Sequence, residues 1–145
     1  MTIRTAHTVW KGGLQDGSGT VSLDSSGLGS HEVTWPSRAN EPDGRTSPEE
    51  LIAAAHSACY SMALAHELGG RGARPESVET RAEVTFVPGQ GITGIQLTVR
   101  ASVPGMSTQD FAAAAETAEK NCPVSQALAG TSIQLRAELA SSGPS

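Results

Sequence analysis

The 145 residues suffice for one domain, and with only two tryptophans, two phenylalanines and one tyrosine its core must be built from alanine, valine, leucine and isoleucine. The formal net charge of −5 at pH 7 argues against nucleic acid and anionic membranes as partners. No stretch approaches the roughly 18 apolar residues of a membrane span, and the N-terminus lacks the apolar run of a signal peptide, so we expect a cytoplasmic protein.

The N-terminal third predicts three short strands. Polar and apolar residues alternate over residues 5–10, 19–23 and 31–35, and turns rich in glycine, aspartate and serine separate these runs. Pro36 is expected to end the third strand, and residues 37–45 are predicted to form a loop.

Residues 48–68 predict a long central helix. Ser47 is a suitable N-cap, a proline follows it, and Glu50 stands at the spacing of a capping box. Small and apolar side chains then line nearly every side of the helix, which predicts burial on nearly every side and close approach of its neighbours. The glycines at 69 and 70 are expected to end it.

The second half predicts a hairpin, a further helix and a last strand. Residues 77–87 and 92–103 alternate in polarity around a Pro-Gly-Gln-Gly turn, as the strands of an antiparallel hairpin do. An alanine-rich helix capped by Ser107 or Thr108 is predicted to reach about residue 120. A short helical turn and a strand at 131–139 are expected to follow.

The order of these elements is β-β-β-α-β-β-α-β. It indicates an α+β fold in which mainly antiparallel sheets pack on helices. We interpret residues 1–145 as a single domain, with a frayed tail over residues 140–145.

Two cysteines are the first candidates for chemistry. Cys59 lies in the middle of the central helix, where an inert small apolar residue is the alternative interpretation. Cys122 precedes Pro123, and if Pro123 opens a helix, Cys122 is its N-cap and the helix N-terminus favours the thiolate form. An ordinary turn residue is the alternative there. A structural disulfide between the two is a further alternative, against which a reducing cytosol argues.

Two charged residues flank the beginning of the central helix. Arg38 lies in the preceding loop, where simple solvation is the alternative, and Glu49 lies in the first turn, where the helix dipole stabilises a carboxylate. The four histidines show no zinc-like spacing with the cysteines, so we expect no metal site.

Two cysteine motifs resemble the OsmC/Ohr family of bacterial organic-hydroperoxide reductases. They are Ser-Pro-Glu-Glu-Leu-Ile-Ala-Ala-Ala-His-Ser-Ala-Cys-Tyr-Ser-Met-Ala-Leu at 47–64 and Asn-Cys-Pro-Val-Ser-Gln at 121–126. The resemblance covers essentially the whole chain in matching order. The Ohr branch carries its arginine near the first hairpin, whereas this chain has no arginine between Arg4 and Arg38. That difference favours the OsmC branch and makes Arg38 the candidate active-site arginine, with Arg45 as the substitute.

The resemblance implies an OsmC-like fold and a thiol-dependent peroxidase that reduces organic hydroperoxides to alcohols in oxidative and osmotic stress defence. Cys59 would attack the O–O bond and become a sulfenic acid, with which Cys122 would condense to a disulfide. Arg38 would hold Cys59 as the thiolate and polarise the peroxide, and Glu49 would orient Arg38. No cofactor is implied, and an external dithiol, for example a dihydrolipoyl group, would be the reductant.

The residues agree with this chemistry. Burial raises the pKa of a thiol, so Cys59 needs a nearby cation to be a nucleophile at neutral pH, and a guanidinium stays charged. We assign His56 and Met62, which flank Cys59 along the helix, to the substrate pocket. A core histidine with satisfied hydrogen bonds is the alternative for His56.

The helix geometry predicts a homodimer. Glu49 and Cys59 are ten residues apart, which corresponds to about 15 Å of rise. We therefore predict that Arg38 and Glu49 serve Cys59 of a partner subunit, at active sites on the dimer interface. The intertwined dimers of the family that the chain resembles agree with this.

Two other functions remain open from the sequence. One is a non-catalytic protein that binds a small ligand in an apolar interface pocket, with structural cysteines. It would keep ligand binding after Cys59→Ser. The other is a redox sensor or structural stress protein, which would form the disulfide without turnover in the presence of a dithiol.

Overall fold

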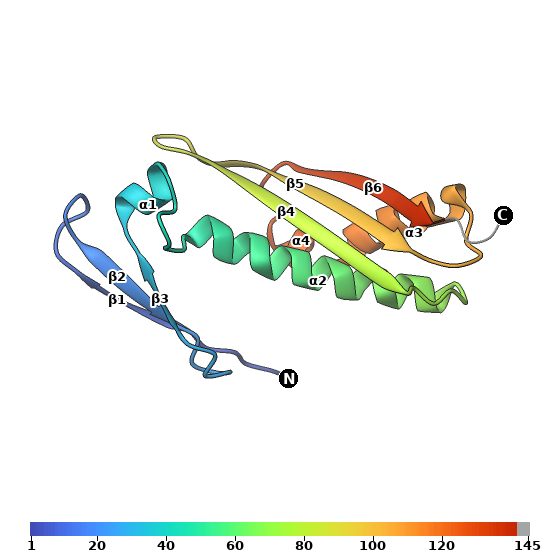
Figure 1. The fold of residues 1–145 in the computed structure, drawn as a ribbon, viewed down its shortest axis with the longest axis horizontal. Coiled ribbons are helices and arrows are strands. Elements are labelled where there is room, and N and C mark those ends of the chain that lie inside the picture. The colour runs from blue at the N-terminus through green and yellow to red at the C-terminus, as the bar shows by residue number, and fades with distance from the viewer. Residues whose placement is uncertain (142–145) are drawn as a thin grey trace. The chain divides into compact units, whose positions relative to one another are not determined.

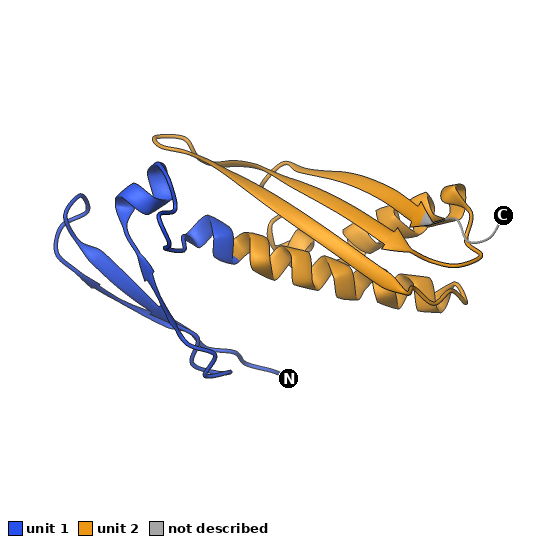
Figure 2. Cartoon of the chain, in the orientation of Figure 1, with its two compact units in different colours: residues 1–51 blue, residues 52–145 orange. Residues whose placement is uncertain are grey.

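The computed structural model describes residues 1–141, in six strands and four helices (Figure 1). They form two compact units, residues 1–51 and the chain from residue 52 onwards (Figure 2). The mixture of two small sheets and helices confirms the α+β prediction. The interpretation as a single domain stays a prediction.

The first unit contains a three-stranded antiparallel sheet. Its strands β1 (His7–Lys11), β2 (Ser18–Ser22) and β3 (Ser30–Val33) pair in sequence order. Gly19 of β2 is required by close packing, because a Cβ there would lie 2.8 Å from the Trp10 ring and 3.0 Å from Val33. The three predicted strands are thus present, although the third is shorter than expected.

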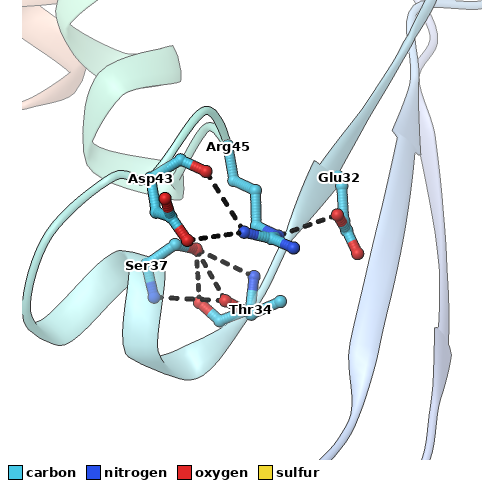
Figure 3. Close-up of polar contacts among 5 residues, drawn as sticks. All are labelled: Glu32, Thr34, Ser37, Asp43 and Arg45. Atoms are coloured by element: carbon cyan, nitrogen blue, oxygen red, sulfur yellow. Dashed lines mark hydrogen bonds and ion pairs between the residues drawn. The ribbon is translucent and has the colours of Figure 1, made fainter.

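The predicted loop contains a short helix, α1 (Trp35–Ala39), so the expectation of a strand to residue 35 and a loop from 37 was wrong. A reciprocal capping box at the N-terminus of α1 explains why this helix forms (Figure 3). The Ser37 N–H donates to Thr34 Oγ1 and the Thr34 N–H donates to Ser37 Oγ, each at 3.1 Å. Pro36 is tolerated because the first turn of a helix needs no N–H partner.

The central helix α2 (Pro48–Gly70) begins where predicted and ends two residues later. At its beginning the Glu50 N–H donates to Ser47 Oγ at 3.1 Å, while the Glu50 carboxylate accepts from the Thr46 hydroxyl at 2.6 Å. The structure therefore has the serine half of the predicted capping box, with Thr46 as the partner of the glutamate.

The C-terminus of α2 is a Schellman motif around Gly72, whereas Gly69 and Gly70 continue the helix. The Ala73 N–H donates to Leu68 O at 2.9 Å and the Gly72 N–H to Gly69 O at 3.1 Å. Gly72 has φ +76°, the left-handed conformation that this motif requires.

We expect Gly72→Ala to lower the free energy of unfolding by about 1 kcal/mol, because a side chain disfavours that backbone conformation. The matched variant Gly70→Ala, in helical backbone with open space around it, should raise it by about 0.5 kcal/mol. Urea unfolding followed by circular dichroism measures both. Shifts of the same sign would contradict the assignment of Gly72 as the cap.

The second unit contains a sheet of three longer strands, β4 (Ser77–Val87), β5 (Gly91–Ser102) and β6 (Ile133–Ser141). The predicted hairpin is present as the antiparallel pair β4–β5. β6 pairs parallel to β5, whereas the other pairings of the described strands are antiparallel, so the sheets are mainly antiparallel as predicted. The reason for the parallel pair is the crossover through α3 (Thr108–Asn121) and α4 (Pro123–Ala127), which returns the chain to the end at which β5 begins.

β6 includes residues 140 and 141, which the sequence assigned to a frayed tail. The rest of that predicted tail, residues 142–145, lies outside the described part of the chain.

The core of the second unit lies between its sheet and the helices that cover one face of it (Figure 1). α2 contributes one stripe of side chains at helical spacing, and β5 and α3 provide the facing surfaces. The stripe consists of His56, Tyr60, Leu64 and Leu68.

The opposite side of α2 is exposed, including Ala54, Ala55, Ala58 and Met62. The expectation of burial on nearly every side is therefore wrong for the single chain, whose own sheet and helices cover only one side of α2. None of the described helices combines the length and apolarity that crossing a bilayer requires.

Candidate active site

The two cysteines lie side by side in the second unit. Cys59 comes from the middle of α2 and is partly exposed, and Cys122, at the junction of α3 and α4, is fully buried. Both are free thiols, and Cys122 is close enough to Cys59 to influence its pKa. Burial raises the pKa of the Cys59 thiol; the Val124 N–H, which donates to the sulfur, opposes this shift, and the neighbouring Cys122 adds to it.

The capping geometry places Cys122. Its backbone is extended, with φ −66° and ψ 117°, and Pro123 follows in the first turn of α4. The prediction of Cys122 as a helix N-cap is therefore confirmed. The N–H groups of the first helical turn have no partner within the helix, and that of Val124 is directed to Cys59. The beginning of α4 thus supplies both a second thiol and a hydrogen-bond donor to Cys59.

His56 lies one turn before Cys59 and is fully buried. Its Nε2 is 2.6 Å from Ser125 Oγ in α4. Burial lowers the pKa of His56, which favours the neutral imidazole. Met62, the other residue assigned to the pocket, is 73% exposed on the uncovered side of α2. The pocket roles of both residues stay predictions.

The structure brings Arg38 and Glu49 together in the first unit. The Arg38 Nε donates to Glu49 Oε1 and Oε2 at 3.0 and 3.1 Å, and its Nη2 donates to Oε2 at 2.8 Å. Glu49 is only 6% exposed, whereas the Arg38 side chain is about one third exposed. This two-point contact fixes the plane of the guanidinium.

Arg45, the substitute candidate, has other partners (Figure 3). Its Nε donates to Glu32 Oε1 at 2.8 Å, and its Nη1 contacts Asp43 Oδ2 at 3.3 Å. The Glu49 carboxylate is therefore bound by Arg38, and the choice of Arg38 over Arg45 as the active-site arginine stays a prediction. The catalytic roles of Arg38 and Glu49 stay predictions.

Sequence reasoning missed two members of this arrangement. They are the Val124 N–H, a backbone group without a side-chain signal, and Ser125, the partner of His56. No signal in the sequence pointed to Ser125, because its partner His56 lies 69 positions away along the chain. Within residues 1–141 no group of three or more histidine, cysteine, aspartate or glutamate residues is arranged to hold a metal ion.

Comparison with known proteins identifies the family. The sequence model of the OsmC-like proteins matches residues 41–138. The chain is 41% identical over 132 residues to peroxiredoxin OsmC of Escherichia coli (strain K12). This match covers 88% of this chain and 92% of that protein.

Solved structures show the same fold. The organic hydroperoxide resistance protein OsmC of Legionella pneumophila matches with a TM-score of 0.69 at 24% identity, over 97% of this chain and 100% of that one. An OsmC-like protein of Mycoplasma pneumoniae matches with a TM-score of 0.73 at 15% identity, over 95% and 97% of the two chains. The family suggested by the two cysteine motifs is confirmed: the chain belongs to the OsmC-like proteins.

Proposed function

We propose that the protein is a thiol-dependent peroxidase that reduces organic hydroperoxides to alcohols. The observation that carries this proposal is the pair of neighbouring free thiols, one partly exposed and one buried. Membership of the OsmC-like family and the similarity to a protein named peroxiredoxin support it.

The proposed reaction has three steps. The Cys59 thiolate attacks one oxygen of the hydroperoxide; the O–O bond breaks, the alkoxide takes a proton and leaves as the alcohol, and Cys59 becomes a sulfenic acid. The Cys122 sulfur then attacks the Cys59 sulfur, the hydroxyl leaves as water, and a disulfide forms. An external dithiol reduces that disulfide through a mixed disulfide and is itself oxidised.

The proposed site requires a cation, because burial raises the pKa of Cys59 and disfavours its thiolate. We propose that Arg38 supplies this charge and also polarises the peroxide, with Glu49 holding its plane. Glu49 and Cys59 are ten positions apart along α2, about 15 Å of helical rise, so we propose that the pair acts on Cys59 of a second copy. The exposed alanines and Met62 of α2 are the surface proposed to pack in such a homodimer.

Thiol counting tests the proposed function. Reduced protein mixed with stoichiometric cumene hydroperoxide should lose two thiols per chain, and a Cys122→Ser variant should accumulate a sulfenic acid on Cys59, trapped by dimedone. An unchanged thiol count in the unmodified protein would overturn the peroxidase and favour a binding protein with structural cysteines.

A further inference from the structure

His56 is a buried polar residue that the proposed reaction does not use. It joins α2 to α4 through the 2.6 Å contact of its Nε2 with Ser125 Oγ, across 69 positions of sequence. Its other ring nitrogen, Nδ1, is buried without a hydrogen-bond partner in the described part of the chain. A buried polar atom left unpaired destabilises the fold, so core packing alone does not explain a histidine at this position.

The unpaired Nδ1 indicates the state of the ring. A buried N–H without an acceptor is rarer than an acceptor without a donor, so we assign the proton to Nε2. The Nε2–H then donates to Ser125 Oγ, and the imidazole is neutral. This gives a directional bond from α2 to the first turn of α4.

The position of this bond relates it to the cysteines. His56 and Cys59 are three residues apart and lie on the same side of α2. Their partners, Ser125 and the pair Cys122 and Val124, all lie at the beginning of α4. Two successive contacts from one side of α2 therefore hold this turn.

α4 has little local structure to hold itself. It contains five residues, and its N-cap Cys122 makes no side-chain capping hydrogen bond. A helix of this length is not stable by its own hydrogen bonds and depends on its contacts with the rest of the fold.

We propose that His56 and Ser125 are positioning residues that hold the first turn of α4 against α2 and so keep Cys122 within reach of the Cys59 sulfenic acid. This rests on the proposed function. Disulfide closure requires the two Cβ atoms to approach to about 4 Å with a defined dihedral angle, so a loosened turn lowers the rate of closure. Neither residue is a hydrogen-bond partner of either sulfur atom. Their bond influences the first oxidation only indirectly, through the Val124 N–H in the same turn, whereas it acts on disulfide closure through the position of Cys122.

Two rates measured on the same protein test the proposal. The protein receives a pulse of cumene hydroperoxide and is quenched with dimedone at successive times. Mass spectrometry then gives the rate at which the Cys59 sulfenic acid forms and the rate at which it is consumed. In Ser125→Ala we expect formation within about twofold of the unmodified protein and consumption slowed about tenfold.

Three further variants separate positioning from general loosening. Ser61→Ala is the matched control, since its hydroxyl joins α2 to Thr80 of β4 at 2.7 Å, and it should close the disulfide at the normal rate. His56→Leu should slow closure as Ser125→Ala does, and it replaces that variant if Ser125→Ala fails to fold. His56→Gln, whose amide can donate from a similar position, should restore most of the rate.

Normal closure in Ser125→Ala or His56→Leu, or equal slowing in Ser61→Ala, would overturn the positioning role. Failure of the unmodified protein to form the sulfenic acid is a different result. It would refute the proposed function, and this inference with it.

Discussion

Arg38→Ala will slow the oxidation of Cys59 by cumene hydroperoxide about 100-fold, the loss typical for a preorganised charge at a reacting centre. Without the guanidinium the partly buried Cys59 thiol keeps a raised pKa, so the thiolate is scarce at neutral pH. The residual rate should therefore rise as the pH rises above neutrality. Single-turnover loss of the Cys59 thiol, followed between about pH 6 and pH 9, measures both effects.

Arg45→Ala is the matched control, because that arginine is bound to Glu32 and Asp43 in the same unit. Its oxidation rate should stay within about twofold of normal. Arg38→Ala also leaves the buried Glu49 carboxylate unpaired, so the double variant Arg38→Ala, Glu49→Gln serves to separate activity from folding. A normal rate in the double variant, or an equal loss in Arg45→Ala, would remove Arg38 from the proposed mechanism.

Subunit complementation will restore activity when an Arg38→Ala chain is paired with a Cys59→Ser chain. If Arg38 serves the thiol of the partner, one of the two sites in this heterodimer contains an intact Cys59 and an intact Arg38. The purified heterodimer should then show about half the normal activity per dimer, whereas each homodimer is nearly inactive.

Co-expression with two different affinity tags yields the heterodimer. An inactive heterodimer would show that Arg38 acts within its own chain. A protein that is monomeric by light scattering at working concentration would refute the shared site altogether. The activity of the heterodimer thus separates the two arrangements. It is about half the normal activity if Arg38 acts on the partner's Cys59, and almost zero if Arg38 acts within its own chain.

Local signals in the sequence predicted much of the fold. The β4–β5 hairpin followed from alternating polarity around a glycine-rich turn, and the beginning of α2 followed from Ser47 and the residues after it. α1 was missed although Thr34 and Ser37 have capping-box spacing, because five residues show no helical periodicity. The parallel pairing of β6 was missed because it depends on the path of a crossover rather than on the strand's own residues.

The candidate site was predictable in the same uneven way. Cys122 was identified as an N-cap from the proline after it, and the partnership of Arg38 with Glu49 was expected from the family resemblance. The bond between His56 and Ser125 joins positions 69 residues apart, and no local rule connects them. The exposed side of α2 was misjudged because composition shows that a surface is apolar but not what covers it.

The parallel crossover also determines when the segment that contains Cys122 can fold during synthesis. Cys122 lies in the connection between β5 and β6, so its segment is enclosed only after the last strand has paired. The ribosome synthesises α2, which contains Cys59, and the β4–β5 hairpin before it reaches Cys122 and β6. If the proposed function is right, a nascent chain oxidised in that interval has a sulfenic acid with no resolving thiol, and further peroxide converts it irreversibly to the sulfinic acid. Under that proposal, the time to synthesise residues 60–122, up to and including Cys122, sets the minimum length of the period in which a peroxide can inactivate the nascent chain.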